Sequence, residues 1–249
     1  MYNFFIEKQS QENGYYKIEG DNFNHITMVL RMKVGERLLV SQDGKSNLCE
    51  IAEIFADHLT VRIIEENYLN SELPVDICLL QGLPKADKLE LIIQKAVELG
   101  ATEILPVETA RSVVRIEEKK KKQKTERWQA IAEAGAKQSK RNVVPKVHAP
   151  LSFKQVLPLL KDFDLLLVPY ENKNGMADTI SALQEIKVGQ RIGVFIGPEG
   201  GFEQGEIDTL LTLSNTRIVS LGKRILRTET ASITALSMLM LHVESSFVK

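Results

Sequence analysis

The sequence predicts an α/β protein with a small β-rich domain at 1–70 and a larger domain with a mostly parallel sheet at 74–249. Two observations support this prediction. Short apolar runs separated by turn residues fill the first segment, whereas continuous apolar runs alternate with amphipathic stretches in the second. Continuous apolar runs are typical of strands buried on both faces, and their alternation with helices favours a parallel sheet covered by helices.

The first segment contains a strong hairpin signal. The apolar run at 38–40 leads into Asp43-Gly44, a dipeptide that favours a two-residue hairpin turn, and apolar runs follow at 48–54 and 59–64. The polar stretch at 65–74 ends in proline and is predicted to be a linker.

One helix is expected inside the β-rich segment, at 22–31. Asp21 stands before it as a candidate N-cap, and Ile26, Val29 and Leu30 fall on one face.

The second segment alternates predicted strands and helices. Its clearest helix begins at Asp87, which has capping-box spacing with Glu90, and stops at Gly100. Further helices are predicted at 118–139 and from Thr228 through Leu241. The apolar stripe of the first helix consists of Leu89, Ile92, Ile93, Ala96 and Val97. The predicted strands are 75–80, 103–107, 165–168, 192–196 and 218–221.

Composition excludes several classes of protein. Of 249 residues, 43% are hydrophobic and 26% charged, as in ordinary globular proteins. No run approaches the ~18–20 apolar residues of a membrane span, and the N-terminus lacks the pattern of a secretory signal. Cys49 and Cys78 have no histidine cluster nearby, so neither a disulfide framework nor a metal site is predicted, and both are expected to be buried. We therefore expect a cytoplasmic protein that does not enter the membrane.

Positive charge is concentrated in one stretch although the net charge is only −1. Lysine and arginine are dense between Arg111 and Lys146, as in a segment that meets phosphates. Glutamates are interleaved with them, which is equally typical of a solvated helix face. Charge alone leaves both interpretations open.

A glycine-rich loop follows the predicted strand at 192–196. Ligands of open α/β sheets bind at the carboxyl ends of strands, and the glycines at 197–201 would let backbone approach a ligand closely. The alternative is a plain turn into a helix begun by Glu203 and Glu206. The loop lacks the Lys-Ser/Thr pair of a triphosphate site and the glycine spacing of a dinucleotide site.

The stretch LGKRILRTETA at 221–231 is unusual because the apolar pair Ile225 and Leu226 stands among cations. Such a pair could hold an aromatic ring, with Thr228 capping the next helix. A loop that simply packs on the core is the alternative.

These segments together resemble the bacterial 16S ribosomal RNA uracil N(3)-methyltransferases, a family of the SPOUT class of knotted methyltransferases. The resemblance covers nearly the whole chain. Small departures are Ala86, Ala110, Lys137 and Lys140, which stand where the family more often has Gly, Glu, Glu and Gly. The matching segments, besides IGPEGGF at 196–202 and LGKRILRTETA, are HITMVLRMKVGE at 25–36, LPKADKLELIIQKAVELGA at 83–101, ARSVV at 110–114 and RWQAIAEAGAKQSKRNVVPKV at 127–147.

The resemblance implies a PUA-like β-barrel that binds RNA, followed by an α/β domain with a trefoil knot. It implies a homodimer that uses S-adenosylmethionine to methylate N(3) of one uridine (uracil-1498) of 16S ribosomal RNA in the small ribosomal subunit. A non-catalytic RNA-binding assembly factor, or a knotted methyltransferase for another rRNA or tRNA position, is the alternative.

The resemblance also implies a set of site residues. The adenine would lie among Leu221, Gly222, Ile225, Leu226 and Ala231. The whole predicted cofactor set is Val168, Pro169, Tyr170, Glu171, Ile196, Gly197, Pro198, Glu199, Gly200, Gly201, Leu221, Gly222, Ile225, Leu226, Arg227, Thr228, Thr230 and Ala231.

Methylation of uracil N(3) requires loss of its proton, so a base or a group that stabilises the uracil anion is expected. Arg227 is the candidate for the second role, and Glu199 and Glu229 are candidates for the base, although Glu229 also suits the start of a helix. The candidate RNA contacts are Arg31, Lys85, Lys88, Arg111, Arg115, Gln138, Ser139 and Arg141.

Overall fold

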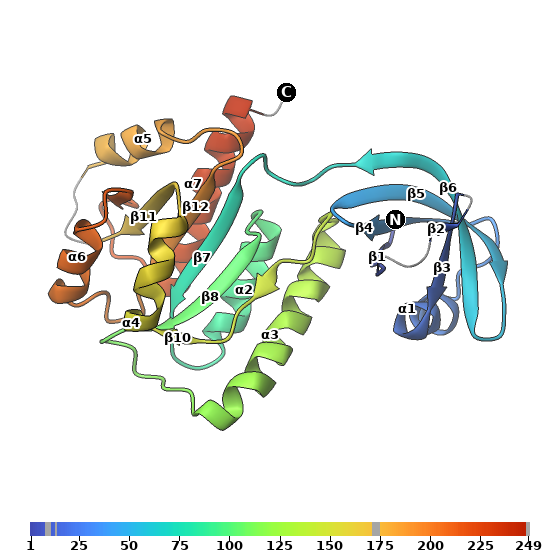
Figure 1. Cartoon of the computed structure of the whole chain (residues 1–249), viewed down its shortest axis with the longest axis horizontal. Helices are drawn as coiled ribbons and strands as arrows, with labels where there is room; N and C mark the ends of the chain where they lie inside the picture. The colour runs from blue at the N-terminus through green and yellow to red at the C-terminus, as the bar shows by residue number, and fades with distance from the viewer. Residues whose placement is uncertain (8–10, 13, 171–174, 248–249) are drawn as a thin grey trace. The chain divides into compact units, whose positions relative to one another are not determined.

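The computed structural model of the chain describes residues 1–7, 11–12, 14–170 and 175–247 (Figure 1). These residues form two compact units. The first unit comprises Met1–Glu72 and Ala136–Val144, and the second comprises Leu73–Gly135 and Pro145–Lys249. The boundary crosses the chain three times, so the first unit is made of two separate segments.

The first unit is built on a six-stranded sheet with the order β1-β4-β5-β6-β3-β2. Asp43 and Gly44 join β4 to β5 with φ values of 49° and 78°, which confirms the predicted hairpin turn. Neighbouring strands are antiparallel except β1 and β4. The strands are β1 (Asn3–Phe5), β2 (Gln11–Glu12), β3 (Tyr15–Glu19), β4 (Arg37–Gln42), β5 (Lys45–Ile54) and β6 (His58–Leu69).

The expected linker at 65–74 is wrong in its first half. β6 continues to Leu69 because its polar end still pairs with β5, where Leu69 lies opposite Ser46.

The helical insert of the first unit differs from the prediction. α1 (Gly20–Asn24) starts earlier, after Glu19, so Asp21 lies inside its first turn and is not the N-cap. α1 continues into a π-helix, η1 (His25–Val29). Ile26 is buried as expected, but Val29 is 69% exposed. The wider π-turn, in which Leu30 N–H bonds to the His25 carbonyl five residues back, breaks the 3.6-residue period on which the prediction rested.

A buried ion pair joins the two segments of the first unit. The Arg141 side chain is only 3% exposed, and its Nε donates to both carboxylate oxygens of Glu72 at 2.9 Å. Glu72 also accepts a hydrogen bond from the backbone N–H of Asn142 at 2.7 Å. Charge and geometry therefore fix the segment after α3 in the first unit.

The second unit contains a seven-stranded parallel sheet with the order β10-β8-β7-β12-β11-β13, and β9 pairs with β8. All the apolar runs predicted as strands belong to this sheet, although the last strand ends before Leu221. The strands are β7 (Asp76–Gly82), β8 (Glu103–Glu108), β9 (Lys146–Val147), β10 (Leu151–Ser152), β11 (Leu165–Pro169), β12 (Arg191–Ile196) and β13 (Thr216–Val219).

Helices cover both faces of this sheet. On one face α7 packs against β12 and α2, and the predicted apolar stripe of α2 is buried throughout. Gly100, with φ of 93°, ends α2 as predicted. The helices are α2 (Lys88–Glu98), α3 (Glu118–Ser139), α4 (Phe153–Val156), the 3₁₀-helix η2 (Leu157–Asp162), α5 (Ala177–Gln184), α6 (Gln204–Leu211) and α7 (Thr228–Phe247).

The predicted capping box of α2 is wrong. The Asp87 side chain makes no capping hydrogen bond. The Glu90 carboxylate instead binds Arg127 of α3 at 2.8 Å.

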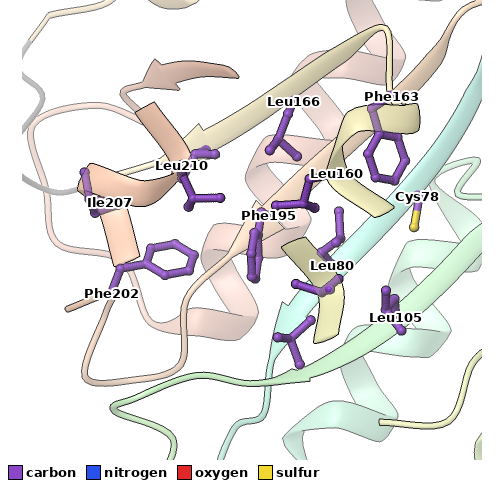
Figure 2. Close-up of a cluster of buried hydrophobic side chains, with 13 residues drawn as sticks. Cys78, Leu80, Leu105, Leu160, Phe163, Leu166, Phe195, Phe202, Ile207 and Leu210 are labelled. Carbon is purple, nitrogen blue, oxygen red and sulfur yellow. The ribbon is translucent and has the colours of Figure 1, made fainter. Parts of the chain in front are cut away.

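A core cluster of the second unit lies on the other face of the sheet, shown in Figure 2. Leu80, Leu166 and Phe195 project from neighbouring strands, and η2 and α6 cover them. Cys78 and, in the first unit, Cys49 are buried as predicted, and burial raises the pKa of each thiol to about 12. Neither thiol is therefore a nucleophile near neutral pH.

Among the helices that the structure describes, none has the length and apolar character needed to cross a bilayer. The trefoil knot that the resemblance implies stays a prediction.

We expect Glu72→Gln to destabilise the first unit by about 3 kcal/mol, because it leaves the buried Arg141 guanidinium without its counter-charge. Urea denaturation followed by circular dichroism measures this loss. The single tryptophan, Trp128, is buried in the second unit, so its fluorescence follows that unit separately.

The control is Glu19→Gln, which removes the exposed ion pair with Lys17 and should leave the transition unchanged. An equal effect of the two variants would contradict the assigned role of Glu72.

Candidate functional site

A cavity of about 350 Å³ lies where three neighbouring strands of the second unit end. β12, β11 and β13 are parallel, so their carboxyl ends meet at one edge of the sheet, and the segments that follow them form the walls. The lining residues are Lys88, Pro169, Tyr170, Ile196, Gly197, Pro198, Glu199, Gly201, Phe202, Ser220, Leu221, Gly222, Lys223, Arg224, Ile225, Leu226, Arg227, Thr228 and Ala231.

The glycine loop at 197–201 is a tight turn with little room around it. Gly201 has φ of 66°, and its N–H bonds to the Pro198 carbonyl at 2.9 Å. A Cβ on Gly82, at the end of β7, would lie 2.6 Å from Pro198 Cδ and its backbone nitrogen. The strand end therefore touches the loop backbone directly, and only glycine fits at position 82.

α6 follows the loop, as expected if the loop is a turn into a helix. Glu203 and Glu206 form a reciprocal capping box at its start. The Glu206 carboxylate also accepts a hydrogen bond from Ala110 N–H at 2.8 Å. The loop is therefore both a turn into a helix and a wall of the cavity.

Thr228 does not cap α7 as the sequence suggested. It lies inside the helix, and its hydroxyl donates to the Gly197 carbonyl at 2.8 Å. The carbonyl of Arg227 accepts the first helical hydrogen bond, from Ala231 N–H. The hydroxyl thus joins the glycine loop to the start of α7.

The loop at 221–227 is held at its base and open at its tip. Thr179 Oγ1 and the backbone of Ser220 exchange two hydrogen bonds of 2.9 Å in a buried position, and Gly222 turns the chain with φ of 110°. The predicted apolar pair is split, because Leu226 is half-buried whereas Ile225 is 87% exposed. Both line the cavity.

Lys88 connects two carboxylates beside the cavity. Its Nζ lies 2.9 Å from Glu199 Oε1 and 3.5 Å from Glu229 Oε2. The longer contact lacks hydrogen-bond geometry, so Glu229 Oε2 is buried without a hydrogen-bond donor among the described residues.

Glu199 is the more strongly held of the two carboxylates, since Lys85 N–H also donates to it at 3.1 Å. Partial burial raises the pKa of the Glu199 carboxyl, but hydrogen bonds from Lys88 and the backbone outweigh it, so this pKa lies below its ordinary value. The hydrogen bond to Glu199 in turn raises the pKa of Lys88.

Most described residues of the predicted cofactor set line this cavity, but three do not. Val168 is buried in the core, Gly200 lies against Arg111, and Thr230 is exposed on α7. Glu171 lies outside the described residues. Sequence reasoning missed Phe202, Ser220, Lys223 and Arg224 as lining residues and did not place Lys88 there.

Arg141 is a correction to the predicted RNA contacts, because its side chain is buried against Glu72. Lys85, Lys88 and Arg111 gather around the glycine loop, where Arg111 Nη1 donates to the Gly200 carbonyl at 3.0 Å.

The other predicted contacts lie elsewhere. Arg115 pairs with Glu108 at 3.5 Å. In the first unit, Arg31 and Gln138 are exposed, and Ser139 is half-buried in the last turn of α3.

The lysine run at the start of α3 consists of side chains paired with neighbouring glutamates. Lys119 to Lys122 contact Glu117, Glu118 or Glu126 at 2.8–3.9 Å. This arrangement favours the solvated helix face over a phosphate-binding surface.

The lining suits a ligand that combines a flat apolar ring with polar groups. Leu221, Ile225 and Leu226 offer apolar contact, and loop backbone offers hydrogen bonds. In the described part of the chain, no three His, Cys, Asp or Glu side chains are grouped so that they could hold a metal ion.

Two family models match the chain. An RNA methyltransferase domain matches residues 71–240, and an RNA methyltransferase PUA domain matches residues 18–64. The two matches agree with the parallel-sheet unit and with the six-stranded sheet before it.

Relatives match over the full length. The ribosomal RNA small subunit methyltransferase E of Bacillus subtilis is 41% identical over 98% of both chains. The enzyme of the same name from Mesomycoplasma hyopneumoniae is 33% identical over 94% of this chain and 96% of its own.

Solved structures agree with these relatives. Ribosomal RNA small subunit methyltransferase E from Neisseria gonorrhoeae, bound to S-adenosyl methionine, is 27% identical with a TM-score of 0.80 over 97% of each chain. A Legionella pneumophila methyltransferase in complex with the same cofactor is 30% identical with a TM-score of 0.79 over 96% of each chain. With these matches and the cavity at its strand ends, the chain belongs to the ribosomal RNA small subunit methyltransferase E family.

Proposed function

We propose that this protein uses S-adenosylmethionine to methylate N(3) of one uridine of 16S ribosomal RNA, acting on the small ribosomal subunit. The cavity between the glycine loop and the loop at 221–227 carries the proposal, because its apolar and backbone lining suits this cofactor. The Neisseria and Legionella structures, which hold S-adenosylmethionine in the same fold, support it. The family name supports the small-subunit RNA as substrate.

The residues present fit the cofactor. Leu221, Gly222, Ile225, Leu226 and Ala231 would hold the adenine ring. When bound, the cofactor supplies a methyl group on a sulfonium, which is the electrophile.

Arg227 would stabilise negative charge on a uracil oxygen as the N(3) proton leaves. It lines the cavity, is exposed, and among the described residues makes no ion pair. It directly precedes α7, where the helix dipole disfavours a positive charge. Because a positive charge at this position destabilises the helix, the presence of Arg227 here supports a role in binding or catalysis.

Glu229 is the better of the two candidate bases. Glu199 is held by Lys88 and by Lys85 N–H, and its lowered pKa makes it a weak proton acceptor. Glu229 keeps one oxygen without a hydrogen bond. We therefore assign Glu199 the role of holding the glycine loop and Glu229 the role of accepting the N(3) proton.

The RNA would meet cations at the mouth of the cavity. Lys223, Arg224 and Arg227 line it, and Lys85 and Arg111 lie at the glycine loop. Phosphate contacts by such side chains would make binding fall steeply with salt. Arg31 in the PUA-like unit would add a contact.

We infer a homodimer from large apolar side chains that are exposed on the second unit. Leu241 of α7 is 66% exposed and Ile225 is 87% exposed. Sedimentation of wild type and Leu241→Glu tests this inference, since the substitution should shift the protein towards monomer.

The decisive experiment incubates small subunits that lack the modification with protein and labelled S-adenosylmethionine, then maps the methylated nucleotide by mass spectrometry. Label on uridine N(3) is expected. Cofactor-independent binding without label would favour an assembly factor, and label on another base would leave a methyltransferase with a different substrate.

We expect Gly82→Ala to weaken S-adenosylmethionine binding at least tenfold, because the new Cβ would displace the glycine loop at Pro198. Titration calorimetry measures the loss. Gly205→Ala is the matched control, since a Cβ there meets nothing within 4 Å and alanine favours the helix. If both variants bind S-adenosylmethionine with the same affinity, the glycine loop is not part of the binding site.

Arg227→Ala should lower kcat by about 100-fold or more, in the range seen when one donor to a developing anion is removed. Arg227→Lys keeps the positive charge and should lose less. Single-turnover methylation of the subunit measures both, and full activity of the alanine variant would exclude the charge-stabilising role.

Glu229→Gln and Glu199→Gln form a matched pair on either side of Lys88. The first should lower kcat with little change in KM for the cofactor, because it removes the proton acceptor. The second should mainly raise that KM, because it loosens the loop. If steady-state kinetics instead show that Glu199→Gln lowers kcat and Glu229→Gln raises KM, Glu199 is the base.

A further inference from the structure

Gln81 is a completely buried amide at the carboxyl end of β7, outside the lining of the cavity. A buried amide of this kind is stable only with hydrogen-bond partners. Its Nε2 donates to the Gly82 carbonyl at 2.9 Å and to Thr228 Oγ1 at 3.0 Å. Its Oε1 accepts from the Ser232 hydroxyl at 2.5 Å. Both ends of the amide are therefore engaged.

Gln81 donates to Thr228, and Thr228 donates in turn to the glycine loop. A hydroxyl has a single proton, and that of Thr228 is donated to the Gly197 carbonyl at 2.8 Å. Thr228 must therefore accept at its remaining position, and the Gln81 amide supplies that donor. The residue after Gly197 is Pro198, which has no N–H, so this carbonyl is the anchoring group of the peptide.

The next residue of the same strand holds the loop by contact. Gly82 packs so closely that an added Cβ would lie 2.6 Å from Pro198. The end of β7 thus touches the loop through Gly82 and reaches it through Gln81 and Thr228. The two interactions fix both the distance and the orientation of the Gly197 peptide.

We propose that Gln81 is a positioning residue for the cofactor site. Through Thr228 and Ser232 it fixes the start of α7, which bears one wall of the cavity, relative to the glycine loop, which forms another. The inference rests on the proposed function. Loss of the amide therefore weakens cofactor binding, although Gln81 does not touch the cofactor.

The test is Gln81→Met, which keeps the length of the side chain but removes every hydrogen bond of the amide. The dissociation constant of S-adenosylhomocysteine, measured by calorimetry, should rise about tenfold, as expected for the loss of one to two buried hydrogen bonds. KM for S-adenosylmethionine should rise with it while kcat stays within a few-fold.

Asn215→Leu is the matched control. The Asn215 amide also donates to two backbone carbonyls, of Leu160 at 2.9 Å and Phe163 at 2.7 Å, but it precedes β13 at the opposite end of the strand from the cavity. This variant should lower thermal stability and leave the dissociation constant unchanged. Equal weakening by the control would reduce Gln81 to a general stabiliser and overturn the proposal.

Ser232→Ala decides the question if Gln81→Met does not fold. Alanine is favourable in α7, and the substitution removes the hydroxyl that contacts both Gln81 Oε1 and, at 2.9 Å, the Thr228 carbonyl, so about threefold weaker binding is expected. If the Ser232→Ala variant binds S-adenosylhomocysteine with the affinity of the wild type, the positioning role of Gln81 is wrong, whereas the proposed function stands. Failure of the wild-type protein to bind S-adenosylhomocysteine would instead reject the proposed function.

Discussion

Burial of the parallel sheet on both faces is the constraint on which the second unit depends. Helices cover each face, so the sheet interior has no polar surface to offer a ligand. Recognition is left to the segments that follow the strands, and three adjacent parallel strands place those segments together. The cavity, its glycine loop and its cations all follow from this arrangement.

Most polar side chains at this edge of the sheet hold the loops in place and do not face a ligand. The hydroxyls of Thr228 and Thr179 form their hydrogen bonds with loop backbone, and Glu199 is held by Lys88. Arg227 lines the cavity without such a partner among the described residues. This division separates the side chains that shape the site from those available to a substrate.

Features set by local physics could be predicted from the sequence. The Asp43-Gly44 turn needs two positive φ values that these residues tolerate, and the α2 stripe needs only a 3.6-residue period. The predicted face at 22–31 failed because a π-turn breaks that period, and the capping box at Asp87 failed because Glu90 pairs with Arg127 of α3, which no local pattern contains.

The site was predictable in its loops but not in its supports. Glycines and an apolar pair among cations mark residues 197–201 and 221–231, and the resemblance orders them. Gln81 carried no signal, since a glutamine inside an apolar run reads as part of a strand. Arg141 looked like a free cation because its partner, Glu72, is 69 residues away in the chain.

The split composition of the first unit has a consequence for synthesis on the ribosome. Its second segment, Ala136–Val144, emerges only after more than sixty residues of the second unit have been made. Until then Glu72 has no Arg141 to bind, and the first unit lacks the ion pair that joins its two segments. Folding of this chain during translation is therefore not strictly sequential, since the first unit is completed only after more than a third of the second has been synthesised.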